Sequence, residues 1–514
     1  MIHISAKHRA VGVPYRPDIA NLFPSAKQVT LQGYPHIVLP HGLEETRVLR
    51  NLGYDVPAPI LTHYDWAGGS PFDVQKKTCA MLTTNPRAYV LNGMGTGKTK
   101  SALWAFDYLR SVGLAQRMLV VAPLSTLNFT WMREVFNTLP HLSSVVLHGS
   151  RAKRFERLAQ DHDIYIINHD GLKVIAGELK NRKDIDVLCL DELAVYRNGG
   201  SERTEVTREV ARLTPWVWGM TGSPTPNEPT DAWAQATIVT PNTVPKYFSR
   251  FREDLMSRVT QFKWVPKPDA VEKAFAAMQP AVRFTLDDVA ELPDLVERTV
   301  DVEMGDRQAK VYKQMEEHAF AAVASHEITA VNAGVVLNKL LQISLGYVYS
   351  NEKGIIALDN DERLNAIVDI VNSTDRKVIV FAPFVHALDG IAKRLTSEGY
   401  DTRQVSGDTP KSERDEVFNL FQNTSSIKVI AAHPQCMSHG LTLTAADTII
   451  WAAPITSLEI FLQANARIRR VGQKHKQQII MLQGSKVEKR AYARLRAKEH
   501  VQNLLLEMFE EASE

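Results

Sequence analysis

Two stretches in which short apolar runs alternate with longer helix-forming segments constrain the fold of this chain more than any other feature. In the first, between residues 67 and 240, runs such as Met118–Val121 and Val187–Leu190 are separated by segments such as "KSALWAFDYLRSVG". The alternation resumes between residues 296 and 514, in runs such as Lys377–Pro383. This pattern is typical of parallel sheets covered by helices, and the 514 residues exceed the roughly 250–300 that one hydrophobic core supports. We therefore predict an α/β fold with two parallel-sheet lobes.

Three further segments differ from this pattern. Residues 1–66 contain short strand-like runs and one helical segment that ends at Gly53, which predicts a small N-terminal α+β domain. Residues 241–295 are basic and aromatic without clear strands, and we expect a mostly helical linker there. Residues 305–345 predict a helical insertion at the entry to the second lobe.

Composition excludes some classes of protein and leaves others open. The formal net charge of +2 neither indicates nor excludes a nucleic-acid-binding protein, because a groove can be basic on a nearly neutral chain. The three cysteines, Cys79, Cys189 and Cys436, are far apart and predict a reducing, cytoplasmic location. Since no window approaches the roughly 20 apolar residues of a membrane helix, we expect no membrane association.

The stretch "LNGMGTGKTK", Leu91 to Lys100, joins an apolar run to a helical segment. Backbone N–H groups and a helix N-terminus at such a turn favour an anion, and glycines allow close approach of phosphate. Lys98 would supply positive charge and the Thr99 hydroxyl would bind Mg²⁺. Because the strict pattern has glycine where this chain has Asn92, a glycine-rich turn with a solvated lysine is the alternative. The predicted phosphate-binding residues are Met94, Gly95, Thr96, Gly97, Lys98 and Thr99.

Two adjacent acids, Asp191 and Glu192, follow the apolar run that ends at Leu190. In a site for nucleoside triphosphate, Asp191 is placed to hold Mg²⁺ and Glu192 to orient or deprotonate the attacking water. An acidic helix N-terminus is the structural alternative.

Six motifs follow one another along the chain: "PFDVQKKTCAML", the phosphate loop, "VVAPLSTLNFTWMREV" (Val120–Val135), "IYIINHDGL" (Ile164–Leu172), "GMTGSPTPN" (Gly219–Asn227) and "QANARIRRVGQ" (Gln463–Gln473). Taken together and in this order, they resemble the motifs of superfamily-two helicase-like ATPases of the Swi/Snf branch, in the compact form of phage and bacterial enzymes. The resemblance implies two RecA-like lobes that form a helicase motor core over about five-sixths of the chain, ATP and Mg²⁺ as cofactors, and hydrolysis of ATP.

The resemblance also assigns roles to single residues. Gln75 matches an adenine-reading glutamine, whose amide has the donor and acceptor that adenine needs. Arg467 and Arg470, predicted on one helix face together with Gln463, match arginine fingers that complete the nucleotide site from the second lobe. The coupling residues are Thr221 and Ser223, and the residues implied to contact nucleic acid are Pro123, Asn168, Gly440 and Thr444.

The implied activity is that of an ATP-dependent translocase or helicase that moves along or remodels duplex, forked or branched DNA. An RNA helicase and an ATP-gated nucleic-acid clamp without translocation are the alternatives. We expect a monomer, with residues 1–66 as a candidate DNA-substrate module. The chain departs from the family pattern at Ala194, where a histidine is usual, and at Asn92 and Gly93, which replace an Asp-Glu pair.

Overall fold

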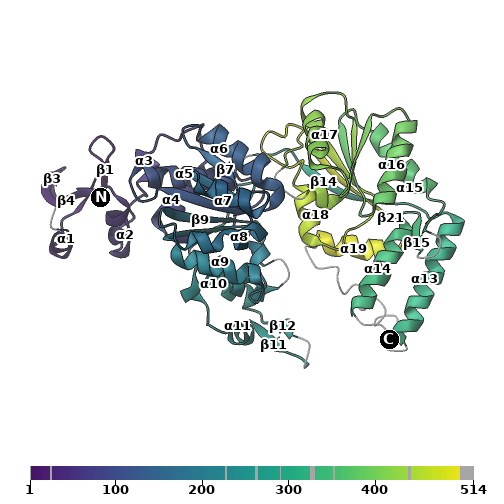
Figure 1. The fold of residues 1–514 in the computed structure, drawn as a ribbon, viewed down its shortest axis with the longest axis horizontal. Helices are drawn as coiled ribbons and strands as arrows, with labels where there is room; N and C mark the ends of the chain where they lie inside the picture. Colours follow the sequence, from purple (N-terminus) through teal and green to yellow (C-terminus); the bar gives the residue numbers. More distant parts are fainter. Residues whose placement is uncertain are drawn as a thin grey trace. The chain divides into compact units, whose positions relative to one another are not determined.

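The computed structural model describes residues 2–23, 26–225, 228–260, 264–289, 291–324, 330–350, 354–437 and 441–497. The chain forms two compact units, Met1–Val289 and Ala290–Glu514. Each unit contains one parallel sheet with helices on both faces, which confirms the predicted α/β fold with two parallel-sheet lobes (Figure 1). In the part of the chain that the structure describes, no helix is long and apolar enough to cross a membrane.

The first unit begins with a small antiparallel sheet in the order β1-β2-β4-β3. Val11, Val13, Ile37 and Leu39 form its buried core together with the two helices that cover it. The strands are β1 (His3–Ser5), β2 (Ala10–Pro14), β3 (Lys27–Leu31) and β4 (Tyr34–Pro40), and the helices are α1 (Pro17–Leu22) and α2 (Leu43–Asn51).

The main sheet of the first unit has seven parallel strands in the order β13-β5-β10-β9-β6-β8-β7, of which β13 is Ala281–Val282. Alternate residues of each strand face opposite cores: Val90 and Met118 lie in one core, whereas Tyr89 and Leu119 lie in the other. Helices α4, α5 and α6 cover the first face, and α8, α9 and α10 cover the second (Figure 1). The strands are β5 (Arg87–Val90), β6 (Arg117–Ala122), β7 (Ser144–Val146), β8 (Ile164–Asn168), β9 (Ile185–Asp191) and β10 (Trp216–Met220), and the helices are α3 (Ile60–His63), α4 (Asp73–Thr84), α5 (Lys98–Ser111), α6 (Arg133–Thr138), α7 (Arg151–Ala159), α8 (His169–Leu179), α9 (Glu202–Leu213) and α10 (Ala232–Val239).

The segment expected to be a helical linker, residues 241–295, belongs largely to the first unit. It contains α11 (Phe248–Leu255), the hairpin β11 (Met256–Arg258)–β12 (Trp264–Pro266) and α12 (Ala270–Ala277). Strand β13 (Ala281–Val282) then joins the edge of the main sheet by pairing in parallel with β5. The chain therefore returns to the sheet next to the strand that leads into the predicted phosphate loop.

The second unit has a six-stranded parallel sheet in the order β14-β21-β20-β17-β19-β18. A buried ion pair of Arg363 with Glu488, 3.0 Å long, joins α15 to α19. The strands are β14 (Leu295–Asp301), β17 (Lys377–Phe381), β18 (Thr402–Val405), β19 (Val429–Ala432), β20 (Ala446–Trp451) and β21 (Gln477–Gln483), with the hairpin β15 (Tyr347–Ser350)–β16 (Gly354–Ala357), and the helices are α13 (Asp306–Ala324), α14 (Ala330–Ser344), α15 (Asp361–Asn372), α16 (Val385–Ser397), α17 (Lys411–Asn423), α18 (Leu458–Asn465) and α19 (Lys486–Arg496).

Candidate nucleotide site

The predicted phosphate loop, acidic pair and coupling motif follow three adjacent strands of the first unit. In the sheet register, Met220 of β10 lies opposite Val90 of β5 on one side and Asp191 of β9 on the other. Because all three strands are parallel, the residues that follow them leave the sheet at the same edge. The structure thus brings these three motifs together at the carboxyl ends of the central strands.

The phosphate loop connects β5 to α5, which begins at Lys98. Gly95 and Gly97 have φ of +81° and +79°, the left-handed region that favours glycine. A Cβ on Gly97 would also lie only 2.0 Å from Nε2 of Gln75. The backbone conformation therefore favours glycine at position 97, and a Cβ there would also displace the Gln75 amide. The loop presents backbone N–H groups at the start of a helix, where an anion is favoured.

The Lys98 ammonium group lies inside the loop. Its Nζ donates hydrogen bonds to the carbonyl oxygens of Asn92, at 2.8 Å, and Gly93, at 3.0 Å. Thr96 Oγ1 donates to the same Gly93 oxygen at 2.9 Å. A Cβ on Gly222 would come within 3.9 Å of Lys98 Nζ and 3.8 Å of Met94 Cγ, so the turn after β10 packs against this loop.

The acidic pair is held at the end of β9. Trp131 Nε1 donates to Asp191 Oδ2 at 2.9 Å, and the backbone N–H of Glu192 donates to Asp191 Oδ1 at 3.1 Å. Burial raises the pKa of Asp191, whereas the Trp131 hydrogen bond and the charge of Lys98 oppose that rise. The sequence analysis did not predict the contact of Trp131 with Asp191, because the two residues are 60 positions apart and no local pattern links them.

Glu192 has a left-handed backbone with φ of +56°. For a residue with a Cβ this conformation costs about 1–2 kcal/mol. Such strain persists where surrounding structure fixes it, and it is found preferentially at functional sites. The turn directs the chain from β9 into the short 3₁₀ segment Leu193–Tyr196.

Gln75 and Thr221 both pack close to the loop. Gln75 is only 3% exposed; its Oε1 accepts from the Phe72 N–H at 2.8 Å and its Nε2 donates to the Gly97 oxygen at 3.5 Å. Thr221 is buried, and its Oγ1 accepts from the Ser223 N–H at 3.2 Å. Gln75 therefore joins α4 to the phosphate loop, and its adenine-reading role stays a prediction.

The residues predicted to contact nucleic acid have different surroundings. Pro123 follows β6, and its carbonyl oxygen accepts from the backbone N–H of Thr126 at 2.9 Å. The Asn168 Oδ1 atom accepts from Arg154 Nη1 at 3.3 Å, and Thr444 Oγ1 accepts from the Gln422 amide at 3.2 Å. Gly440 lies outside the described residues.

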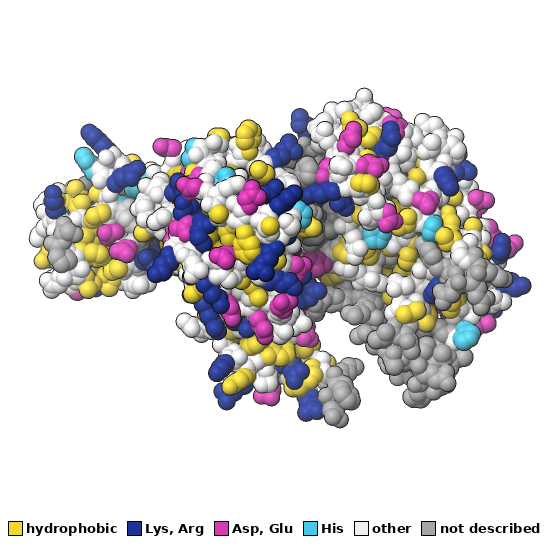
Figure 2. Space-filling view, in the orientation of Figure 1, with side chains coloured by type: hydrophobic (Ala, Val, Ile, Leu, Met, Phe, Trp, Pro, Cys, Tyr) yellow, Lys and Arg dark blue, Asp and Glu magenta, His cyan; other side chains and the backbone are white. Residues whose placement is uncertain are grey.

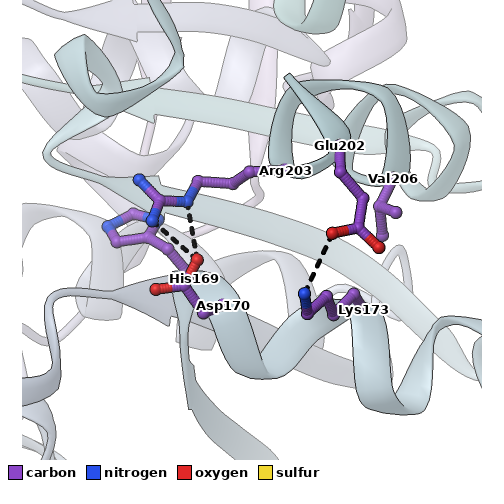
Figure 3. Close-up of a pocket in the computed structure, with 6 residues that line it drawn as sticks. All are labelled: His169, Asp170, Lys173, Glu202, Arg203 and Val206. Carbon is purple, nitrogen blue, oxygen red and sulfur yellow. Dashed lines mark hydrogen bonds and ion pairs between the residues drawn. The ribbon is translucent and has the colours of Figure 1, made fainter.

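Next to Asn168, a small pocket separates the first turns of α8 and α9 (Figure 3). Two ion pairs join these helices across it, Arg203 with Asp170 at 2.6 Å and Lys173 with Glu202 at 2.9 Å. His169 shares a 2.8 Å hydrogen bond with the Tyr196 hydroxyl, which lies in the segment after the acidic pair. On the face of the first unit seen in Figure 2, Lys and Arg side chains are interspersed with Asp and Glu side chains.

In the second unit, the structure corrects the helix predicted to carry both arginines. Helix α18 ends at Asn465, so Arg467 and Arg470 lie in the turns that follow it. Arg467 is 2% exposed and donates to the carbonyl oxygens of Gln463, at 2.8 Å, and Leu441, at 3.1 Å. The helix stops because these turns pack back on the segment before β20, where the Leu443 N–H donates to the Arg467 oxygen at 3.0 Å.

Arg470 and Gln463 each donate a hydrogen bond to another side chain of the second unit. Arg470 Nη1 donates to Thr442 Oγ1 at 3.1 Å, and burial lowers the pKa of Arg470 to about 10, so its guanidinium stays charged at neutral pH. Gln463 Nε2 donates to Glu459 Oε1 at 3.1 Å.

Gln473 organises the turns that carry the arginines. Its Nε2 donates to the carbonyl oxygens of Ala446, at 2.9 Å, and Ile468, at 3.1 Å. Its Oε1 accepts from the backbone N–H groups of Lys474, at 3.0 Å, and His475, at 3.1 Å. The glutamine that ends "RIRRVGQ" is thus a structural link between the start of β20 and the arginine turns.

Thr99 and Asp191 provide the hydroxyl and carboxylate oxygens that Mg²⁺ prefers. Among the residues that the structure describes, no three His, Cys, Asp or Glu side chains form a cluster that could hold a metal ion by themselves. A hydroxyl and a carboxylate suit Mg²⁺, which proteins bind through one or two carboxylates together with substrate phosphates and water.

Comparison with known proteins identifies the family of this chain. A model of the SNF2-related domain matches residues 83–349, and a model of the helicase conserved C-terminal domain matches residues 362–472. Protein p41 of Acyrthosiphon pisum secondary endosymbiont phage 1 is 26% identical over 383 residues, which are 71% of this chain and 80% of the phage protein. The ATP-dependent DNA helicase DDM1 of Arabidopsis thaliana is 23% identical, over 79% of this chain but 58% of its own length. A solved SWI2/SNF2 ATPase core of Sulfolobus solfataricus has a TM-score of 0.41 and 21% identity, over 84% of this chain and 92% of that one.

Proposed function

The chain belongs to the family of SNF2-related helicase-like ATPases, and from this premise we propose that it is a motor that moves along or remodels duplex, forked or branched DNA. Its enzymatic activity is ATP hydrolysis. The observation that carries the proposal is the meeting of Lys98, Asp191 and Thr221 at one edge of the first sheet.

We assign the first-unit residues as follows. Lys98 exchanges its carbonyl partners for the β- and γ-phosphates, and the residues 94–99 bind the phosphates through backbone N–H groups. Thr99 and Asp191 are the side chains that would hold Mg²⁺, which would supply positive charge to neutralise the phosphates. Glu192 orients and deprotonates the attacking water.

Arg467 and Arg470 of the second unit complete the site in this proposal, with Gln463 beside them. A guanidinium group presents a fixed fork of donors that suits a phosphoryl group whose charge grows in the transition state. Closure of the two units on ATP and their opening after hydrolysis would advance a strand held by Pro123, Asn168, Gly440 and Thr444. Thr221 and Ser223 would relay the change, since their turn packs against the loop that holds Lys98.

DNA is favoured as the substrate because a relative that aligns with 79% of this chain, at 23% identity, is an ATP-dependent DNA helicase by name. Contacts to the phosphate backbone suit movement along DNA, because they do not depend on sequence. We further propose a cytoplasmic monomer, with residues 1–66 as a substrate-binding domain.

The experiment that tests the proposal measures the ATPase rate with duplex, single-stranded and forked DNA and with RNA, using Lys98→Ala as the inactive control. The greatest stimulation by duplex-containing DNA would support it. Equal or greater stimulation by RNA would favour an RNA helicase. Displacement of a third strand from triplex DNA then separates a motor from an ATP-gated clamp, which would hydrolyse ATP without displacing it.

A further inference from the structure

We propose that Asn92 is a positioning residue that links the phosphate loop to residues 280–289, the last stretch of the first unit. The inference rests on the proposed binding of nucleotide at that loop. Asn92 stands where the strict phosphate-loop pattern has glycine, and the functional assignment gives its side chain no role.

The Asn92 side chain is buried, with 1% exposure, and both ends of its amide are bonded. Its Oδ1 accepts from the backbone N–H of Phe284, and its Nδ2 donates to Thr78 Oγ1, both at 3.0 Å. The Thr78 hydroxyl donates its own hydrogen to the Val74 carbonyl oxygen at 2.7 Å, so its oxygen is left to accept from Asn92. These partners are satisfied by one orientation of the amide.

Phe284 is bound to the loop by its carbonyl group as well. The N–H of Gly93 donates to the Phe284 oxygen at 2.7 Å, and the N–H of Leu91 donates to the Val282 oxygen at 2.8 Å. The chain after β13 therefore continues alongside β5 and reaches the phosphate loop. Val289, five residues beyond Phe284, ends the first unit.

The same two loop residues hold the lysine that we assign to the phosphates. Lys98 Nζ donates to the carbonyl oxygens of Asn92 and Gly93, and it must give up these bonds to reach a β- or γ-phosphate. Nucleotide binding thus changes the hydrogen bonds of Asn92 and Gly93, the two residues that bond with the backbone N–H and the carbonyl oxygen of Phe284. Occupancy of the loop is transmitted to residues 280–289 without any need for nucleic acid.

Substitutions at position 92 separate this role from simple packing. Leucine has nearly the shape of asparagine but leaves the Phe284 N–H without its acceptor in a buried place, which is costly. Aspartate keeps an acceptor for that N–H. Asn85→Leu is the matched control, because Asn85 also donates from its Nδ2, at 2.9 Å to the Met81 oxygen, but at the far end of α4.

The test is hydrogen–deuterium exchange of the full chain across residues 280–289, with and without AMP-PNP and Mg²⁺. Saturation is checked for each variant with a fluorescent ATP analogue. In the wild type, AMP-PNP should change exchange in this segment. In Asn92→Leu, nucleotide-free exchange there should rise about tenfold, and the response to AMP-PNP should fall below half of the wild-type response. Asn92→Asp should retain the response, and Asn85→Leu should match the wild type.

Three results would overturn the inference. They are a wild-type segment that does not respond to bound AMP-PNP, an Asn92→Leu variant with the full wild-type response, and equal losses in the leucine and aspartate variants. If the wild type fails to bind the fluorescent analogue at all, the proposed nucleotide site itself is wrong. Binding without a response leaves that site intact and removes only the role of Asn92.

Discussion

The two regions assigned to the nucleotide, one in each unit, are built in different ways. In the first unit the residues follow the ends of adjacent parallel strands, so the sheet register fixes their positions. In the second unit Arg467 and Arg470 lie in turns beyond the end of α18, and side chains hold those turns. The single side chain of Gln473 donates to the carbonyl oxygens of Ala446 and Ile468 and accepts from the backbone N–H of Lys474.

This difference suggests a difference in robustness. A strand end is held by many cooperative backbone hydrogen bonds, and no single side chain decides where it lies. A turn held by one buried amide loses its shape when that amide is removed, because the freed polar groups stay buried without partners. We therefore expect substitutions at the strand ends of the first unit to lower the ATPase rate without changing the local fold. Substitutions in the arginine turns of the second unit should change both the ATPase rate and the local structure.

The prediction with the largest expected effect tests whether the two regions act on the same nucleotide. Arg470→Ala should lower the ATPase rate about 10³-fold or more, because an arginine finger contributes on that scale to phosphoryl transfer. Arg469→Ala, at the neighbouring position, is the control and should stay near the wild-type rate. Equal effects of the two substitutions in a steady-state ATPase assay would contradict the assignment of Arg470.

A second prediction concerns Glu192 in the first unit. Glu192→Gln should reduce turnover by about 10²-fold or more while ATP stays bound, because the base is lost and the phosphate contacts remain. Single-turnover hydrolysis and retention of labelled ATP measure this. Glu202→Gln, an exposed acid paired with Lys173, should behave like the wild type. Hydrolysis at the wild-type rate in Glu192→Gln would show that another group is the base.

A third prediction sharpens the contrast in how the turns are held. Gln473→Leu should destabilise the second unit by about 2 kcal/mol, since the carbonyl oxygens of Ala446 and Ile468 would each lose the donor that the Gln473 amide provides. Gln404→Leu, which removes one hydrogen bond to Asp389, should cost less. Denaturant unfolding of the full chain compares the two. A loss no greater for Gln473→Leu would mean that the turns do not depend on that amide.

The smallest effect concerns the acid–base behaviour of Asp191. Burial already raises its pKa above the ordinary value, and Trp131→Phe removes a donor that favours the ionised carboxylate. The pKa should therefore rise further, and the acidic limb of the ATPase pH profile should move to higher pH by up to about one unit, the scale of one hydrogen bond.

The control for this pH shift is Trp104→Phe. Trp104 is also buried, and its Nε1 donates to the Ala67 carbonyl oxygen at 2.7 Å, away from the acids. This substitution should leave the pH profile in place even if it lowers stability. A shift of equal size in both variants would show that the limb does not report on Asp191.

The sequence alone was enough to predict the two α/β lobes and the motifs of the first nucleotide edge. Strand and helix periodicities are local, and a residue that directly follows a buried strand, such as Asp191, has its place set by the sheet. The phosphate loop could be predicted for the same reason, because its glycines, lysine and hydroxyl are consecutive. These features depend on residues that are close together in the sequence, so a local sequence pattern is enough to predict them.

Only the tertiary structure decided the partners that lie far apart in sequence. Trp131 bonds Asp191 across 60 positions, and Phe284 bonds Asn92 across 192, and neither contact leaves a local pattern. The end of α18 before Arg467 was decided in the same way, since the turns gain bonds to Leu441 and Leu443 that a continued helix would not make. Helix propensity is a weak local preference, and packing against a distant segment overrides it.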